Sequence, residues 1–340
     1  MQHPRDVLLG AQAGTGLLPV CDHYSGVPAR MRKSLALQRA LTVEFGACVF
    51  DVTLDCEDGA PVGGERAHAG LVVALVREAI SAVTPGALRP RIAVRVHPVD
   101  HPSFMDDIAT IIGGAGPWLC HLMVPKVESV ADVERAVAAI DGAMPESTGC
   151  PLPLHVLLES PAAVHRAFDI AAHPRVQSIS FGLMDFVSSH GGAIAAEGLS
   201  GDGQFSHPLV VRAKLEIASA CHAHGKTPSH CVVTEFRDPA AIEKAARIAA
   251  REMGFTRMWS IHPDQIRPIL SAFAPSSADI AQAADIIGKA QAAHWAPIDH
   301  RGHLHDRASY RLFWQLLERA HATGQPLPED ARRHFSPSLP

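Results

Sequence analysis

The sequence predicts an α/β protein: a (β/α)8 barrel of the TIM type, with a C-terminal helical lid extension. Eight short apolar runs alternate with longer stretches of helical periodicity, which is the pattern of parallel α/β folds. Most of the runs are continuously apolar, as in strands that are buried on both faces. Charged residues gather where the runs end, and barrels of this type carry their active sites at those ends.

The eight predicted strands are Leu17–Tyr24, Ala47–Leu54, Ile92–His97, His121–Lys126, Leu154–Glu159, Ser178–Met184, Thr227–Thr234 and Arg257–His262. A doubly wound open sheet is the alternative, because the number of strands alone does not prove that the sheet closes. The chain has no GxGxxG after its first strand and no Walker A loop, which removes the commonest reasons for preferring an open sheet.

The helices between the strands have recognisable ends. Ser129 and Asp132 form a capping-box pattern, and Asp141-Gly142 is expected to end the helix that follows. After the seventh strand, Asp238 is placed as an N-cap and Pro239 as the first helical residue.

The barrel is complete by about residue 275, close to the usual size of about 250 residues. We therefore expect a catalytic barrel over 1–275 and a C-terminal extension, interpreted as a lid, over 276–340. The extension holds two helical patterns, Ser277–Trp295 and Asp306–Gly324, around a histidine-rich loop.

Composition excludes several classes of protein. The 340 residues are 47% apolar and 19% charged, with a formal net charge of −5 and no basic run, which argues against a nucleic-acid partner. No run of about 18 apolar residues predicts a membrane span, and we expect no signal peptide. Seven cysteines without a CxxC pair fit a reducing cytoplasm better than a disulfide framework or a zinc site.

Two acids at the ends of neighbouring strands are the candidate metal ligands. Glu159 ends the fifth predicted strand and Asp185 follows the sixth, so their carboxylates can converge on one rim. Two carboxylates with positions left for water and ligand describe a Mg²⁺ site. Helix capping, or an ion pair with Arg95 or Lys126, is the structural alternative.

Four further charged residues are expected at the same rim. Arg95 either balances the nearby acids or binds a substrate carboxylate in a bidentate manner. Lys126 is a candidate catalytic residue. Glu57 and Asp58 are candidate substrate contacts, with helix capping or support of their neighbours as the alternative.

Six motifs in this order resemble a known family: ACVFDVTLDCEDGAP, RVHP, VPKVES, LLESP, FGLMDF and GFTRMWSIHPDQI. The family is the citrate lyase beta-subunit-like branch of the HpcH/HpaI aldolases, which includes malyl-CoA, citramalyl-CoA and citryl-CoA lyases. The resemblance runs from about Leu17 to about Gly324.

The resemblance implies a phosphoenolpyruvate-binding-like barrel, usually a homotrimer or hexamer, that acts on small-molecule acyl-CoA and 2-oxo acid substrates. It implies Mg²⁺ bound by Glu159 and Asp185, and Arg95 holding the 2-oxo acid. HLHDRASYR resembles a lid motif whose acid handles the proton at the acyl-CoA α-carbon, often from a neighbouring subunit. That acid is Asp306 here, and it is also placed to cap the last helix.

The expected reaction makes or breaks a carbon–carbon bond next to a 2-oxo acid. Mg²⁺ stabilises charge as a Lewis acid, Arg95 supplies a fixed positive charge, and Asp306 moves a proton at the α-carbon. No Schiff base is needed, so Lys126 is expected to act as an electrostatic or structural partner, with Glu128 as its counterpart.

Three positions depart from the family pattern at the substrate rim. The first strand reads His23-Tyr24-Ser25-Gly26, His97 replaces an asparagine after Arg95, and Met258-Trp259-Ser260 replace a motif that usually includes lysine. Tyr24 and His97 are therefore candidate substrate contacts, with rim packing as the alternative, and the substrate is expected to differ from those of the named relatives.

Other functions stay open on sequence alone. The first is a metal-dependent 2-oxo acid aldolase of the same barrel that does not use coenzyme A. The second is a non-catalytic ligand-binding relative, against which the intact Glu159, Asp185, Arg95 and Asp306 argue. An acyl carrier protein is a further partner to consider, although the chain contains no carrier segment.

Overall fold

The eight strands close into a parallel barrel in sequence order, from β1 to β8, with β8 paired back to β1. The computed structural model describes residues 3–10, 18–145 and 150–335. The predicted (β/α)8 barrel is therefore confirmed, and the open-sheet alternative is wrong. The strands are β1 (Cys21–Ser25), β2 (Phe50–Asp55), β3 (Ile92–Arg95), β4 (His121–Val124), β5 (Leu154–Leu158), β6 (Val176–Phe181), β7 (Thr227–His230) and β8 (Arg257–Ser260).

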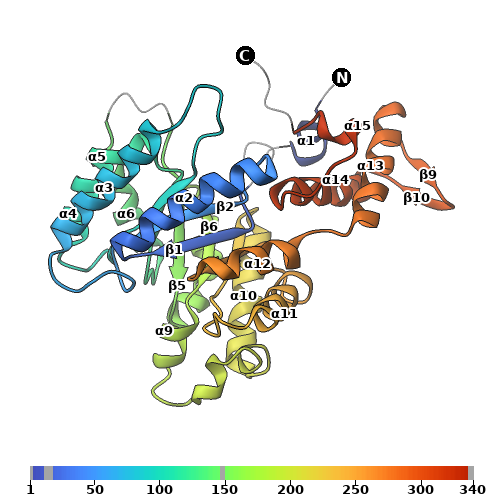
Figure 1. Cartoon of the computed structure of the whole chain (residues 1–340). Helices are drawn as coiled ribbons and strands as arrows, with labels where there is room; N and C mark the ends of the chain where they lie inside the picture. Colours follow the sequence, from blue (N-terminus) through green and yellow to red (C-terminus); the bar gives the residue numbers. More distant parts are fainter. Residues whose placement is uncertain (1–2, 11–17, 146–149, 336–340) are drawn as a thin grey trace.

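Helices surround the barrel (Figure 1). Between the strands lie α2 (Pro28–Phe45), α3 (Glu65–Ser81), α4 (Phe104–Asp107), α5 (Gly113–Ala115), α6 (Val130–Ala143), α7 (Pro161–His165), α8 (Ala167–Ala172), α9 (Leu183–Ser188), α10 (Pro208–Ala223), α11 (Pro239–Arg251) and α12 (Ile266–Phe273). At the two ends of the chain lie α1 (Pro4–Leu9), α13 (Ser277–Ala292), the hairpin β9 (Ile298–His300) and β10 (His303–His305), α14 (Arg307–Ala322) and α15 (Glu329–Arg332). None of the described helices has the length and apolarity needed to cross a membrane.

Most local signals in the sequence are confirmed. Ser129 and Asp132 form the capping box of α6, and Asp238 caps α11 with Pro239 as its first residue. The expected end of α6 at Asp141-Gly142 is wrong, because the helix continues through Ala143. Gly142 lies one residue before the helix ends, and its cost of about 1 kcal/mol relative to alanine does not stop the helix there.

Each of the predicted strands from the third to the eighth runs too far at its C-terminal end, whereas the first two were predicted to end one residue early. The ladder stops at Leu158 before Glu159, at Val124 before Lys126, and at Phe181 before Met184 and Asp185. Asp185 lies on the first turn of α9, not at a strand end. Leu17, the first residue of the first predicted strand, lies outside the described residues. The strands end early because the backbone stops pairing with its neighbours before these residues, so that polar side chains can turn toward the open end of the barrel.

Alternate side chains on the strands pack into two separate clusters. Outward-facing residues such as Val52, Val94 and Val156 join the main core beneath the helices. Inward-facing Tyr24, Met123, Leu157 and Trp259 form a small cluster within the barrel. This separation follows from the two-residue period of a strand. The expectation of burial on both faces is confirmed, but the inner face is also rich in polar residues.

The C-terminal elements have a hydrophobic cluster of their own. It includes Ile287 of α13, Tyr310 and Trp314 of α14, Leu9 of α1 and Ala331 of α15. The first and last helices therefore meet on one side of the molecule (Figure 1). Residues of α14 share a cavity with Val20, Thr227 and Thr256, which lie where β1, β7 and β8 begin. The extension thus packs against the end of the barrel at which the strands start.

Candidate active site

Arg95 is fixed at the mouth of the barrel by Asp55, a residue that is absent from the predicted site. The two residues are paired in register on β3 and β2. The Asp55 carboxylate accepts bonds from Arg95 Nε at 2.7 Å and Nη2 at 2.5 Å. It also accepts the backbone N–H groups of Glu57 and Gly59 at 3.0 and 2.9 Å. All four donors converge on one buried carboxylate, so Asp55 holds the guanidinium in a single orientation.

Arg95 also contacts the loop that follows β2. Its Nη1 lies 2.9 Å from Glu57 Oε2, and these neighbouring acids raise the pKa of Arg95 even though burial acts in the opposite direction. Glu57 in turn pairs with Lys126, whose Nζ lies 3.2 Å from Asp58 Oδ2. The structure therefore brings Glu57, Asp58, Arg95 and Lys126 together.

Lys126 has different partners from those expected. Glu128, its predicted counterpart, instead accepts a hydrogen bond from the Ser160 hydroxyl at 2.7 Å. Lys126 has a φ of +52°, in the left-handed region that side chains rarely adopt. In this conformation its backbone N–H donates to Glu159 Oε1 at 3.1 Å. The strain at Lys126 thus serves to orient the Glu159 carboxylate.

Glu159 and Asp185 converge, as their positions in the sequence predict. Glu159 is 5% exposed, and its pKa is raised well above the usual value by burial first, then by hydrogen bonding with Asp185 and by the charges of Asp185 and Glu57. Gly182 makes room for this arrangement, because a Cβ there would lie 2.5 Å from Glu159 Cγ.

The rim cations compensate the charge of this carboxylate pair only in part, because the charge of Arg95 acts on Glu159 but no ion pair joins either acid to a described cation. Arg95 is held by Asp55 and Glu57, and the Lys126 ammonium by Glu57 and Asp58. Two close carboxylates without a dedicated cation repel each other, and oxygen ligands of this kind suit a hard divalent cation. The carboxylates of Glu159 and Asp185 are therefore suitable ligands for a Mg²⁺ ion.

An aromatic floor lies beneath the charged rim. Tyr24 and Trp259 stack with ring centroids 4.8 Å apart, and the Arg95 guanidinium lies 5.5 Å from the centre of the Tyr24 ring. Tyr24 Oη and Trp259 Nε1 are buried, and neither has a hydrogen-bond partner among the described residues. Buried polar atoms are rarely left unpaired, so these two groups point to a ligand over the floor. Trp259 was not predicted as a site residue.

His97 lies beside the rim and is held by another residue that the sequence reasoning missed. Asp107 accepts bonds from the His97 backbone N–H at 3.0 Å and from Nδ1 at 2.7 Å. The imidazole stacks on His101 with centroids 4.3 Å apart. Because a carboxylate oxygen accepts, Nδ1 is the donor of this bond, and the bond and the stacking together fix the orientation of the ring.

Asp306 is not brought to this site within its own chain. It is exposed and caps α14, accepting the Ala308 and Ser309 backbone N–H groups at 3.0 and 3.4 Å, so its predicted capping function is confirmed. The helix that it caps borders the ends of the strands opposite the rim. In this structure the extension therefore lies at the end of its own barrel opposite the rim.

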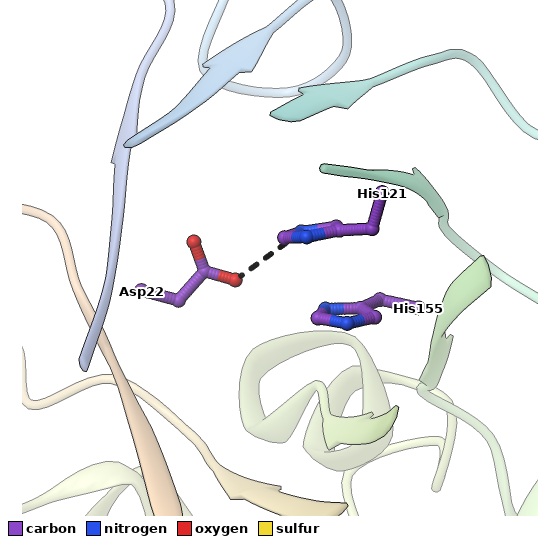
Figure 2. A group of neighbouring side chains, drawn as sticks. All are labelled: Asp22, His121 and His155. Atoms are coloured by element: carbon purple, nitrogen blue, oxygen red, sulfur yellow. Dashed lines mark ion pairs between the residues drawn. The ribbon is translucent and has the colours of Figure 1, made fainter. Parts of the chain in front are cut away.

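A second polar cluster consists of Asp22, His121 and His155 (Figure 2). Each lies two residues before an inward-facing residue of the small inner cluster, so it is one step deeper in the barrel. Asp22, His121 and His155 are buried and offer potential metal-ligand atoms within 4.8 Å of one another. The two imidazoles stack with centroids 3.5 Å apart and 14° between their planes, so their in-plane lone pairs run side by side instead of converging. Burial lowers the pKa of both, that of His155 to about 3.

Charge is already balanced in this deeper cluster. Arg257 Nη2 lies 2.8 Å from Asp22 Oδ2 and 2.7 Å from Asp51 Oδ2, and Arg91 Nε lies 2.5 Å from Asp51 Oδ1. Two guanidiniums against two carboxylates leave no negative charge to attract a cation. We therefore interpret this cluster as a structural layer, and the rim as the chemical site.

A closed (β/α)8 barrel whose mouth holds the paired carboxylates of Glu159 and Asp185 beside an anchored arginine defines the class of protein. The chain belongs to the HpcH/HpaI aldolase/citrate lyase family, which its residues 36–263 match. The resemblance noted from the motifs is thereby confirmed.

Relatives and solved structures agree with this assignment. An L-malyl-CoA/beta-methylmalyl-CoA lyase of Cereibacter sphaeroides is 33% identical over 270 residues, which cover 75% of this chain and 81% of the relative. The crystal structure of a citrate lyase from Burkholderia xenovorans LB400 is 45% identical, with a TM-score of 0.77 and coverage of 98% of this chain and 99% of that one. CitE of Mycobacterium tuberculosis, in complex with magnesium, acetoacetate and coenzyme A, is 21% identical with a TM-score of 0.63 over 89% of this chain and 98% of that chain. This last similarity shows the shared fold.

Proposed function

We propose that the chain is a Mg²⁺-dependent carbon–carbon lyase. It would cleave or form a 3-hydroxyacyl-CoA thioester, with a 2-oxo acid and an acyl-CoA as the other reactants. The observation that carries this proposal is the close Glu159–Asp185 pair, which forms no ion pair with a described cation and lies beside the anchored Arg95. The C. sphaeroides malyl-CoA lyase and the M. tuberculosis complex with magnesium and coenzyme A support the same chemistry.

Each rim residue has a proposed function. Glu159 and Asp185 hold Mg²⁺, which when bound stabilises negative charge on the oxygens of a 2-oxo acid. Arg95 keeps a fixed positive charge where the oxygen on carbon 3 becomes negative. Tyr24 and His97 contact the 2-oxo acid portion. Three more residues contact or orient the substrate: Glu57 and Asp58, which follow β2, and Lys126, which follows β4.

The bond changes in cleavage are those of a retro-aldol reaction. A general base takes the proton of the 3-hydroxyl, and the bond between carbons 2 and 3 breaks. Its electron pair passes to the thioester enolate, and carbon 3 becomes the carbonyl of the 2-oxo acid. Asp306 then protonates carbon 2 as a general acid, or removes a proton from it in the condensing direction.

We infer that Asp306 acts in the site of a neighbouring copy, because α14 borders the opposite end of its own barrel. The active form is therefore a homo-oligomer, for which we propose a trimer or hexamer. Within each copy, residues 1–275 form the catalytic barrel and 276–340 the extension. All seven cysteines are free thiols, which favours the reducing cytoplasm as its location.

The test is a turnover screen with and without Mg²⁺. Acetyl- or propionyl-CoA is offered with glyoxylate, pyruvate or oxaloacetate, and products are identified by mass. Glu159→Gln is the inactive variant, and Glu243→Gln, on the exposed face of α11, is the matched control. A Mg²⁺-dependent hydroxyacyl-CoA made by the wild type and the control, but not by Glu159→Gln, is the expected result.

Two other outcomes are informative. Release of free coenzyme A without carbon–carbon cleavage would indicate a hydrolase, as in the 28% identical (3S)-malyl-CoA thioesterase of C. sphaeroides. Absence of product from every pair would contradict the proposal. Free hydroxy-oxo acids would then test the coenzyme A-independent aldolase.

A further inference from the structure

A cavity of about 320 Å³ lies at the end of the barrel opposite the rim. Its walls come from α1, from the start of β1, β7 and β8, and from α14. Figure 1 shows α1 beside α14. Its volume is at the lower end of the range of small-molecule sites. It therefore suits a small metabolite better than a nucleotide.

The lining of this cavity is strongly basic. Four cationic side chains border it (Arg5, Lys226, Arg311 and Arg319), and Glu318 is the one acid among the described lining residues. Glu318 is already engaged, because it pairs with Arg5 and accepts the Trp314 indole N–H at 2.8 Å. Of the lining cations, Lys226 and Arg319 form no ion pair with a residue that the structure describes, and these two are the ones that need a counter-charge.

Arg319 is the stronger of the two cases. Its side chain is partly buried, and burial alone lowers its pKa, with no acid acting in the opposite direction. No ion pair joins it to any residue that the structure describes. Taking a guanidinium out of water without a counter-charge is unfavourable, and an anion in the cavity would supply that charge.

Lys226 is the second lining cation that forms no ion pair with a described residue. Its ammonium donates to the His173 backbone carbonyl at 3.2 Å, and burial lowers its pKa. Thr227 and Thr256 line the cavity beside it and add hydroxyl groups to the donors. Guanidinium, ammonium and hydroxyl donors around one cavity form the usual environment of an oxyanion.

We propose that this cavity binds a small, multiply charged oxyanion, either phosphate or a polycarboxylate. The bound anion ties α14 to the starts of β7 and β8. The site is separate from the rim, so the proposal does not depend on the reaction that the rim catalyses.

The test measures binding and thermal unfolding of the full-length protein with inorganic phosphate or citrate, against chloride at matched ionic strength. Arg319→Gln and Lys226→Gln remove cavity charges. Arg247→Gln, an exposed change on α11, is the matched control. We expect phosphate or citrate to raise Tm, and each cavity variant to weaken binding at least about tenfold, which is about 1.4 kcal/mol.

A second readout separates ligand binding from simple structural support. Without the anion, Arg319→Gln is expected to unfold at the same or a higher temperature than the wild type, because it removes an unpaired charge. Arg319→Lys, which keeps the charge, is expected to retain part of the binding. Stronger binding of phosphate or of citrate identifies the source of the oxyanion. Failure of both to bind, or equal weakening by Arg247→Gln, would overturn the proposal.

Discussion

Replacement of Asp55 by Asn tests whether this carboxylate fixes Arg95. Each Asp55 oxygen accepts two donors: Oδ1 from Arg95 Nε and the Glu57 N–H, and Oδ2 from Arg95 Nη2 and the Gly59 N–H. An asparagine amide NH₂ on either side would face two donors and lose two hydrogen bonds.

The expected size of the effect follows from that count. Hydrogen bonds to charged groups contribute about 1.5–3 kcal/mol each, so the loss of two lowers the free energy of unfolding by about 3 kcal/mol or more. Arg95 would keep its contact with Glu57 but lose its fixed orientation. A loss of about 1.4–2.8 kcal/mol in transition-state stabilisation corresponds to about a 10- to 100-fold fall in kcat/KM.

The assay is urea unfolding at fixed protein concentration, together with kcat and KM on the substrate pair that the turnover screen identifies. Asp141→Asn is the matched control: Asp141 also makes a two-bond pair, with Arg175 at 2.9 Å, but is 53% exposed. An exposed pair contributes about 0–1 kcal/mol. If Asp55→Asn is no more destabilising than Asp141→Asn, the reasoning about the converging donors is wrong.

Three further predictions concern the other rim residues. Because Glu159 has a raised pKa in the folded chain, its protonated form favours folding below the ordinary pKa, and that contribution is lost as pH rises through the raised pKa. Glu159→Gln is therefore expected to be more stable than the wild type at neutral pH without Mg²⁺, and differential scanning calorimetry should show Mg²⁺ raising Tm only for the wild type. Lys126 is expected to form no Schiff base, so treatment with borohydride in the presence of pyruvate should leave the mass of the protein and its activity unchanged. A reduced pyruvate adduct on Lys126 would contradict this expectation. Glu159→Gln and Asp306→Asn, each inactive alone, should recover part of the activity when dissociated and reassembled together, whereas no recovery would place both residues in one chain's site.

The sequence by itself determined the order of the elements and much of the site. Each βα unit carries its own periodicity and caps, so local patterns were enough to predict a barrel. Because parallel strands end on one rim, the positions of Glu159, Asp185, Arg95 and Lys126 along the chain also predicted that they would meet. The caps at Ser129, Asp238 and Asp306 bind backbone N–H groups only a few residues away. They could therefore also be predicted from local sequence.

Only the tertiary structure decided which groups pair. The pairing of Asp55 with Arg95, and of Lys126 with Glu57 instead of Glu128, depends on register and loop direction between strands, which no local pattern encodes. The polar layer of Asp22, Asp51, His121, His155 and Arg257 exists only once five strands enclose it. The position of α14 at the far end of the barrel also depends on a long-range interface, with α1 and the strand starts. Local sequence specifies local backbone energetics, whereas these contacts are set by the closure of the barrel and the packing of the chain's two ends.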